Sequence, residues 1–290
     1  MKSYLLISLT AQILLLSSFT YAQAPPAAPV YAPTSSGGQG ARPGPLYTTS
    51  TDPYVLALPP PGTSLPLDIK KEVREKLKIS DAERDEFRQI INDKKANIIR
   101  LMSEMPCDKR YTVDVKDERC SGNGQTLLVS FYSFRYKTYL NNILTDIQLT
   151  QGQFVAGNVK HTPGFLVDLG NTDLNKVDLN SEAATVLLGL PKLKNLAEEA
   201  DLNQKLAAGF AQGNVFISYH QKAELNHTYL IRTIAYRIEG EGASWFNVDS
   251  MYVFRVVKLD PDNTVTLAWK KIYEKEAPLL RSAKQADKDK

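Results

Sequence analysis

The side chains that most often perform catalysis are few in this sequence and widely spaced. The three histidines are His161, His220 and His227, and none belongs to the His-Glu-x-x-His pattern with which two histidines on one helix face hold zinc. No Gly-x-Ser-x-Gly motif presents a hydrolase nucleophile. Because a histidine acts as an acid or base only beside a positioned partner, these isolated residues favour structural roles. A hydrolase whose paired carboxylates meet only in three dimensions stays an alternative.

The chain has two cysteines, Cys107 and Cys120, which allow one intrachain disulfide. A bond between them closes a loop of about 14 residues, which chain-entropy considerations value at about 3 kcal/mol. The spacing differs from the Cys-x-x-Cys pattern of redox sites. No histidine lies close to either cysteine in the sequence to complete a zinc site. The pair therefore predicts a structural disulfide, as expected in an oxidising compartment.

A stretch rich in Asp and Asn offers oxygen ligands that calcium prefers. Its candidate ligands are Asp168, Asn171, Asp173 and Asp178. Their spacing matches no calcium-binding loop, and the side chains of Asp and Asn commonly accept hydrogen bonds from the backbone of turns. We therefore predict a connection rich in turns here, and neither a metal nor a cofactor.

Two groups of aromatic residues are candidates for a ligand or partner contact. Tyr132, Phe134 and Tyr136 alternate along a predicted strand and would share one face, where they could stack on a sugar or a base. Aromatic residues are also common on strands that supply a core, and we favour that interpretation for this row. Trp245 and Phe246 lie between glycines and an Asp, in a predicted loop. Because loops often carry function, this pair is the better candidate contact.

The first 24 residues are typical of a cleavable signal peptide. Lys2 supplies a positive start, residues 4–16 are mostly apolar, and Ala22-Gln23-Ala24 provides the small residues that a signal peptidase recognises. The apolar run is too short for a helix that spans about 30 Å of hydrocarbon, and no later segment is apolar enough to do so. We expect a secreted or periplasmic protein with no membrane span after cleavage. The form of the signal peptide is typical of bacteria.

The charge of the chain is nearly balanced, with 35 Lys and Arg against 32 Asp and Glu. Nucleic-acid binders usually carry a strongly basic face, so this balance argues against a nucleic-acid partner. It argues equally against strong attraction to anionic membranes.

Residues 25–66 are rich in Pro, Gly and Ser and predict a disordered linker, because such a segment buries too little apolar surface to offset its ordering entropy.

A short helix is expected over 67–77. A second begins at Ser80, where Ser80 and Glu83 form a capping-box pattern, and is expected to continue to Pro106. Its apolar residues fall at helical spacing and predict one buried face: Phe87, Ile91, Ile98, Met102 and Met105.

Beyond this region the pattern changes to about eight short strands separated by turns, with helical residues over 181–210 broken at Pro191. The predicted strands are 127–137, 143–149, 154–158, 165–169, 215–223, 229–239, 251–259 and 265–273. Turn-connected strands pair antiparallel, so the fold class is α+β, in the order helices, strands, helices, strands. We expect one globular domain over 67–280, with two packed halves that divide near 181–212 as an alternative, and a charged tail over 281–290.

These observations favour an exported, non-catalytic binding or scaffold module of the cell envelope or exterior, which contacts another envelope protein. One alternative is a carrier that holds a small apolar ligand in a cavity lined by its sheet, which predicts a dry internal space. The hydrolase described above is the other.

Overall fold

The computed structural model describes residues 71–90, 97–103, 129–139, 145–158, 162–195, 197–238 and 247–280. The predicted signal peptide, linker and charged tail lie outside these ranges, as do Cys107, Cys120, Trp245 and Phe246. The predictions made for them stay predictions.

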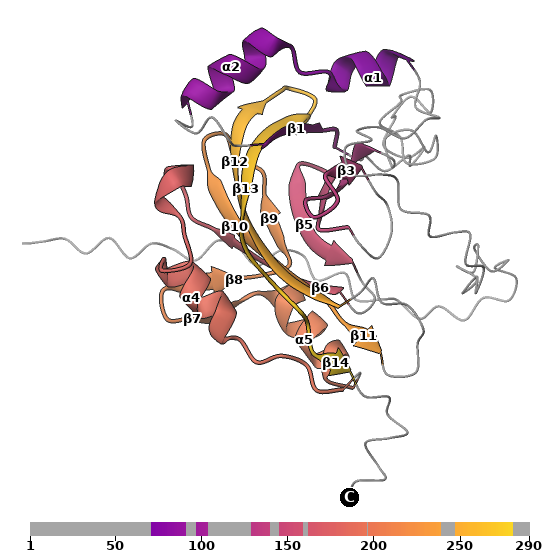
Figure 1. Ribbon diagram of the computed structural model, residues 1–290, viewed down its shortest axis with the longest axis vertical. Coiled ribbons are helices and arrows are strands. Elements are labelled where there is room, and N and C mark those ends of the chain that lie inside the picture. The colour runs from indigo at the N-terminus through magenta and orange to yellow at the C-terminus, as the bar shows by residue number, and fades with distance from the viewer. Residues whose placement is uncertain are drawn as a thin grey trace, which may run out of the picture. The chain divides into compact units, whose positions relative to one another are not determined.

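The protein is an α+β fold built on one ten-stranded, curled sheet (Figure 1). The strand order is β1-β13-β12-β10-β6-β5-β4-β2-β3, with β9 pairing to β5 off this path. Every pairing within the large sheet is antiparallel, as the turn-connected strands predicted. Strands from both sides of residues 181–212 pair with one another in this sheet, for example β6 with β10.

The bounds of the elements in the described ranges are as follows. The helices are α1 Lys71–Leu77, α2 Asp81–Ile90, the 3-10 helix η4 Leu174–Lys176, α4 Glu182–Gly189 and α5 Ala197–Ala208. The strands of the first half are β1 Asn97–Leu101, β2 Phe131–Ser133, β3 Thr138–Tyr139, β4 Ile147–Thr150, β5 Gln153–Asn158 and β6 Thr162–Asp168. Those of the second half are β7 Phe210–Gln212, β8 Val215–Ile217, β9 His220–Lys222, β10 Thr228–Ala235, β11 Arg237–Ile238, β12 Val248–Leu259, β13 Val265–Lys275 and β14 Leu279–Leu280.

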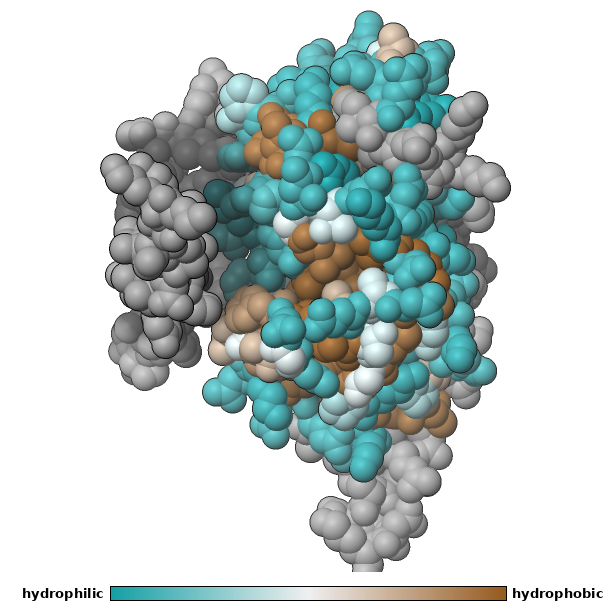
Figure 2. All heavy atoms as spheres, turned by 90° about the vertical axis from the view of Figure 1, so that its left-hand side faces the viewer, coloured by the Kyte–Doolittle hydropathy of each residue, from teal (hydrophilic) through white to brown (hydrophobic). Residues whose placement is uncertain are grey.

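The central strands bury side chains on both of their faces, which is why they read as nearly continuous apolar runs. On β10, Tyr229 and Ile231 belong to an inner core enclosed by the curl of the sheet. Leu230 and Ile234 of the same strand belong to an outer core, to which α4 and α5 contribute Leu187 and Leu206. Figure 2 shows hydrophobic side chains gathered in the middle of the side of the molecule where α4 lies, with hydrophilic ones around them.

The sheet curls until its two end strands approach each other. The hydroxyl of Tyr139 on β3 donates a hydrogen bond of 2.5 Å to the carbonyl oxygen of Arg100 on β1. Two residues further along the chain, the amide of Met102 donates a hydrogen bond of 3.4 Å to the carbonyl oxygen of Val129. The two ends are therefore joined through a side chain and one backbone contact, and no described strand lies between them.

The predicted helix from Ser80 to Pro106 is only half right. The capping box at Ser80 is confirmed, because the Glu83 amide donates to Ser80 Oγ at 3.2 Å and the Ser80 amide donates to Glu83 Oε2 at 3.1 Å. However, α2 ends at Ile90, and Ile98 lies on β1, which pairs with β13. Ile98, Ile99 and Leu101 are buried on the two faces of this strand, Ile98 in the outer core and the others in the inner core. Helical spacing along the chain could not reveal a pairing with residues so distant in sequence.

Candidate functional site

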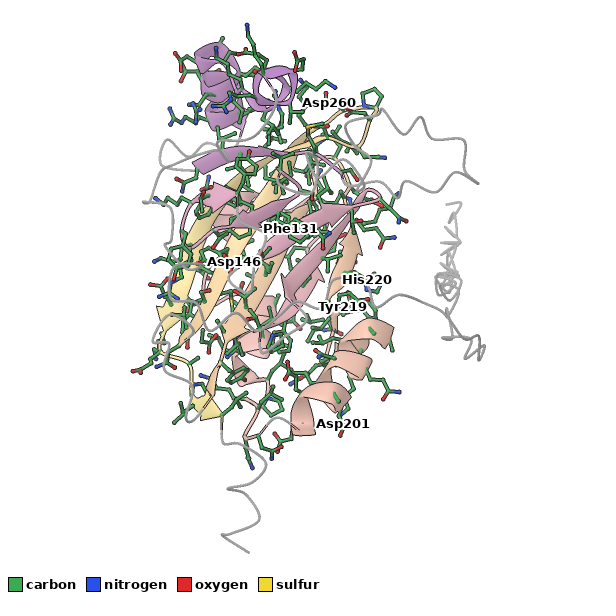
Figure 3. All side chains as sticks on the ribbon, turned by 90° about the vertical axis from the view of Figure 1, so that its right-hand side faces the viewer. Phe131, Asp146, Asp201, Tyr219, His220 and Asp260 are labelled. Atoms are coloured by element: carbon green, nitrogen blue, oxygen red, sulfur yellow. The ribbon has the colours of Figure 1, made fainter. Side chains whose placement is uncertain are left out.

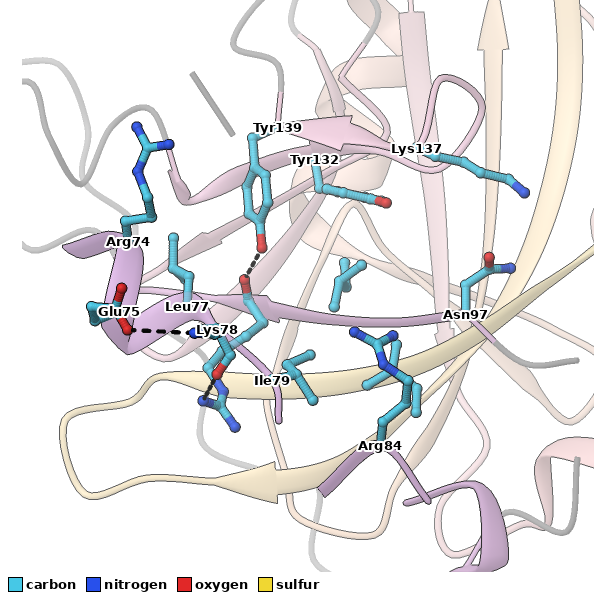
Figure 4. Close-up of a pocket in the computed structure, with 13 residues that line it drawn as sticks. Arg74, Glu75, Leu77, Lys78, Ile79, Arg84, Asn97, Tyr132, Lys137 and Tyr139 are labelled. Atoms are coloured by element: carbon cyan, nitrogen blue, oxygen red, sulfur yellow. Dashed lines mark hydrogen bonds and ion pairs between the residues drawn. The ribbon is translucent and has the colours of Figure 1, made fainter. Parts of the chain in front are cut away.

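A groove of about 640 Å³ lies at the approach of the two sheet ends, bounded by α1, β1 and the β2–β3 hairpin (Figure 4). Its volume is within the range of ordinary ligand pockets, about 300–1,000 Å³. The lining residues come from four segments of the chain and are Arg74, Glu75, Leu77, Lys78, Ile79, Arg84, Asn97, Ile98, Ile99, Arg100, Tyr132, Lys137 and Tyr139.

Arg100 holds the elements around the groove together. Its Nη1 donates to the carbonyl oxygens of Lys76 and Lys78, at 3.1 and 3.0 Å, at the C-terminal end of α1, where carbonyl groups lack helical partners. Its Nε donates to Thr266 Oγ1 of β13 at 3.1 Å, and its Nη2 donates to Glu83 Oε1 of α2 at 3.0 Å. Arg100 is 7% exposed. Its guanidinium is therefore engaged in positioning α1 and α2 on the sheet rather than free for a ligand.

The side chains that do face solvent around the groove are mainly cationic. Among the described residues, Arg74, Lys78, Arg84 and Lys137 line it together with one acid, Glu75, whose carboxylate lies 3.9 Å from Lys78 Nζ. Figure 4 shows Arg74 and Lys137 on opposite sides of the view, Arg74 on α1 and Lys137 in the turn after β2. The neighbouring Glu83 is committed to Arg100: the Ser80 amide and the Arg100 guanidinium lower the pKa of its carboxyl to about 2. The groove consequently presents a positive rim.

The floor of the groove is apolar and well packed. Leu77, Ile98 and Ile99 are buried there, beside the rings of Tyr132 and Tyr139. Burial raises the pKa of the Tyr139 phenol well above its usual range, so that it stays protonated and donates to Arg100. An apolar floor with a cationic rim can bind an elongated ligand that carries negative charge.

The inside of the curled sheet is filled by aromatic rings. The ring of Phe134 lies 4.9 Å from that of Trp269 and 5.1 Å from that of Tyr252, measured between centroids. Phe154, Tyr229 and Phe254 continue this cluster. These rings, contributed by the hairpin and the long strands, form the inner core in the described part of the chain.

The predicted aromatic row is divided between different environments. β2 ends at Ser133, and residues 134–137 form a turn in which Lys137 has a φ of 53°. Phe134 is 1% exposed in the inner core, whereas Tyr132 borders both that core and the groove. Tyr136 is half-buried beneath Arg135, whose guanidinium carbon lies 5.2 Å from the ring centroid. The core interpretation therefore describes Phe134, and Tyr132 is the member of the row that reaches the groove.

A buried acid, Asp146, closes one end of the inner core. Its carboxylate accepts hydrogen bonds from Thr233 Oγ1 at 2.7 Å, Ser133 Oγ at 3.1 Å and the Arg135 amide at 3.2 Å. Burial raises its pKa, although these hydrogen bonds act in the opposite direction. Figure 3 shows Asp146 far from Asp201 and Asp260, so these acids do not form a carboxylate pair. Asp146 ties β4 to β10 and to the β2–β3 turn.

His227 is held between two carboxylates at the surface. Its Nδ1 lies 2.9 Å from Asp168 Oδ2, and its Nε2 lies 3.4 Å from Glu224 Oε2. Each ring nitrogen therefore has a carboxylate as its neighbour, and the three side chains form one polar cluster. His220 lies on β9 with its ring 4.8 Å from that of Tyr219, also labelled in Figure 3. His161 lies outside the described residues.

The Asp- and Asn-rich stretch forms turns, as predicted. Asp168, Asp173 and Asp178 each accept a hydrogen bond from the amide two residues further on, at 2.8–2.9 Å. Arg255 then fixes the stretch to the sheet by donating to the Thr172 carbonyl oxygen at 2.6 Å and to Asn171 Oδ1 at 2.7 Å. Within the described ranges, no group of three or more His, Cys, Asp or Glu side chains is placed to hold a metal ion.

The cations of the groove were not singled out from the sequence. Arg74 and Lys78 are four residues apart, a spacing that places both on one side of a helix, but such charges usually mark a solvated surface. Lys137 and Arg84 reach the same groove only through the pairing of β1 with β13 and the turn after β2. No sequence signal joins these segments.

None of the helices in the described ranges is long and apolar enough to cross a lipid bilayer. Comparison of the chain with known proteins finds no matching family model, no matching curated protein and no matching solved structure.

Proposed function

We propose that this protein is an exported, non-catalytic binding module of the cell envelope or exterior, and that the groove between α1, β1 and the β2–β3 hairpin is where it binds its partner. The observation that carries this proposal is the combination of a 640 Å³ groove with a rim of Arg74, Lys78, Arg84 and Lys137. Export rests on the predicted signal peptide over residues 1–24.

The chemistry of the polar clusters supports binding over catalysis. His227 has both ring nitrogens engaged by carboxylates, and Asp146 is enclosed by hydrogen-bond donors from the protein itself. General acid–base catalysis needs a group within hydrogen-bond reach of a substrate. The cationic side chains that line the groove are the ordinary partners of an anionic ligand.

Site-specific photocrosslinking in the protein's own host tests the proposal. A photoreactive amino acid replaces Lys137 at the groove rim or, as a control, the exposed Lys205 on α5. We expect a discrete covalent adduct with one partner protein at position 137 and none at position 205. An equal pattern of adducts at both positions, or no adduct at 137, would overturn the assignment of the groove.

Native mass spectrometry of the protein purified from its host separates this proposal from the carrier and the enzyme. A protein partner predicts a bare mass for the isolated chain. A stoichiometric lipid or other small organic adduct would instead support the carrier, and a bound metal ion would contradict the non-catalytic module as stated.

A further inference from the structure

The backbone of β1 has one side that no described strand pairs with. β1 is the first strand in the sheet order, and its one strand partner in the described ranges is β13. In an antiparallel strand, the amide and carbonyl of one residue point to the same side, and successive residues alternate. The Arg100 carbonyl and the Met102 amide bond to Tyr139 and Val129, both away from β13. By this alternation, the amide and carbonyl of Ile98 also point away from β13.

The gap between β1 and the β2–β3 hairpin is closed at one end and open at the other. At the end of β1, Met102 bonds directly to Val129. In the middle, the two edges are far enough apart that the whole side chain of Tyr139 is needed to reach Arg100. At the beginning of β1, Asn97 and Ile98 line the groove, with Lys137 on the opposite side (Figure 4). The groove thus extends along β1 to Asn97, beside the outward-facing backbone of Ile98.

We propose that an extended, acidic segment of a partner protein binds in this groove as a short added strand, on the side of β1 that no described strand pairs with. This inference rests on the proposed function and names its ligand. An edge strand presents backbone donors and acceptors to which an extended peptide can pair. Because Tyr139 and Val129 already bond to Arg100 and Met102, the pairing on β1 centres on the amide and carbonyl of Ile98.

Charge complementarity selects the occupant. Arg74, Lys78, Arg84 and Lys137 line the groove, and among its lining residues in the described part of the chain Glu75 is the one acid. A peptide with acidic side chains at alternate positions places them all on one face, where they can meet this rim, and its intervening apolar side chains can meet the floor of Leu77 and Ile99. A basic segment would be repelled by the same rim.

The experiment measures fluorescence anisotropy of a labelled octapeptide of alternating Glu and Val, added to the exported protein. We expect saturable binding that weakens with added salt, and no binding of the matched Lys–Val octapeptide. The variant Arg74→Glu/Lys137→Glu should weaken binding by about tenfold or more, because two attractive charges become repulsive. The control Lys176→Glu/Lys205→Glu makes the same charge change at exposed positions outside the groove and should alter binding by less than about twofold. Urea unfolding verifies that both variants are folded.

Backbone methylation tests the strand pairing itself. One peptide carries N-methyl groups on its Glu amides and a second carries them on its Val amides. Because alternate amides of an added strand face β1, we expect one methylated peptide to lose binding by about tenfold and the other to retain it. Equal affinity of both methylated peptides for the protein would refute strand addition while leaving a groove for anions.

The outcomes distinguish this inference from the proposed function. If position 137 crosslinks to a partner in the host but no acidic octapeptide binds, the occupant proposed here is wrong and the binding module stands. If the Lys–Val peptide binds as well as the Glu–Val peptide, charge complementarity is wrong. If neither crosslinking nor peptide binding is seen, both proposals fail.

Discussion

Arg232 on β10 and Asp249 on β12 form a two-point ion pair inside the protein. The Arg232 Nε and Nη2 atoms lie 2.8 and 2.7 Å from the two carboxylate oxygens of Asp249, and the two side chains are 1% and 0% exposed. Arg232 Nη1 also donates to the Leu187 carbonyl oxygen in α4, and Lys192 Nζ lies 2.9 Å from Asp249 Oδ2. Burial by itself raises the pKa of Asp249, but Arg232 and Lys192 outweigh it and lower that pKa overall. This pair fixes α4 to the sheet.

We expect Arg232→Met to lower the free energy of unfolding by about 3–5 kcal/mol, because it leaves a buried carboxylate with only the half-exposed Lys192 as a partner. Lys192→Met serves as the control and should cost about 1 kcal/mol or less. Urea unfolding monitored by circular dichroism measures both. Similar losses in the two variants would show that Arg232 is not the principal partner of Asp249.

The capping box of α2 predicts a dependence on pH. The pKa of Glu83 is about 2 in the folded protein against an ordinary 4.5. Because the folded-state pKa is the lower one, the stabilisation by Glu83 is complete above pH 4.5 and is lost as the pH falls toward about 2. Glu83→Gln should therefore be less stable than the natural protein at neutral pH, and the difference should shrink across this window. Glu86→Gln, in the same helix but exposed, is the control, whose difference from the natural protein should stay near zero throughout. If the difference in stability between the natural protein and Glu83→Gln does not change with pH, the lowered pKa of Glu83 is wrong.

Two glycines permit the backbones of β5 and β6 to approach each other closely where these strands pair. A Cβ on Gly164 would lie 2.2 Å from the carbonyl carbon of Ala156, and a Cβ on Gly157 would lie 2.3 Å from the carbonyl oxygen of Thr162. We expect Gly164→Ala to prevent folding or to cost at least about 3 kcal/mol, because backbone atoms cannot move aside as a flexible side chain can. Gly170→Ala is the matched control: its φ is +61° with no atom within 4 Å, so it should cost about 1–2 kcal/mol. Thermal unfolding of the two variants measures the contrast. Equal costs for the two variants would mean that the backbones of β5 and β6 lie farther apart at Gly164 than these distances indicate.

The aromatic cluster predicts that Phe134 contributes more than Tyr136 to the stability of the fold. Phe134 is enclosed by Trp269, Tyr252 and Phe254, so Phe134→Ala should lower the free energy of unfolding by about 3–5 kcal/mol. Tyr136 is half-buried, and Tyr136→Ala should cost substantially less. Urea unfolding compares them. A small loss at Phe134 would place that ring in a loosely packed site.

The predicted Cys107–Cys120 disulfide is tested by alkylation of the exported protein under denaturing conditions without reductant. We expect no alkylated thiol, because an oxidising compartment favours the disulfide. The reduced protein should incorporate label at both cysteines and provides the control. Two labelled thiols in the unreduced sample would show that the pair is free.

Local patterns predicted the parts of the fold that are fixed by local interactions. The capping box at Ser80, the turns at Asp168, Asp173 and Asp178, and the antiparallel pairing of turn-connected strands are all present. Each depends on contacts within a few residues. The α+β class follows from them, whereas the predicted order and number of elements hold only in part.

The features that the sequence could not predict depend on distant pairings. Ile98 satisfies a helical spacing with Met102, yet it lies on a strand because β13 offers that strand a partner. The groove exists because this pairing brings α1 and β1 opposite the turn that carries Lys137. In the sequence, neither Arg74 on a charged helix nor Lys137 in a turn differs from an ordinary surface cation. The curl of the sheet brings the two side chains to the same groove.

The pairing of β1 with β13 also sets the order in which the protein can be completed. Asn97 pairs with Trp269, and Arg100 donates to Thr266, so β1 cannot take its place in the sheet until β13 has been synthesised. Contacts so distant in sequence slow folding and keep partly formed chains exposed for longer. A nascent chain that stops short of β13 would leave α1, α2 and the groove without their anchor, however well its middle strands had paired. The groove is therefore completed only after β13 has been synthesised and has paired with β1.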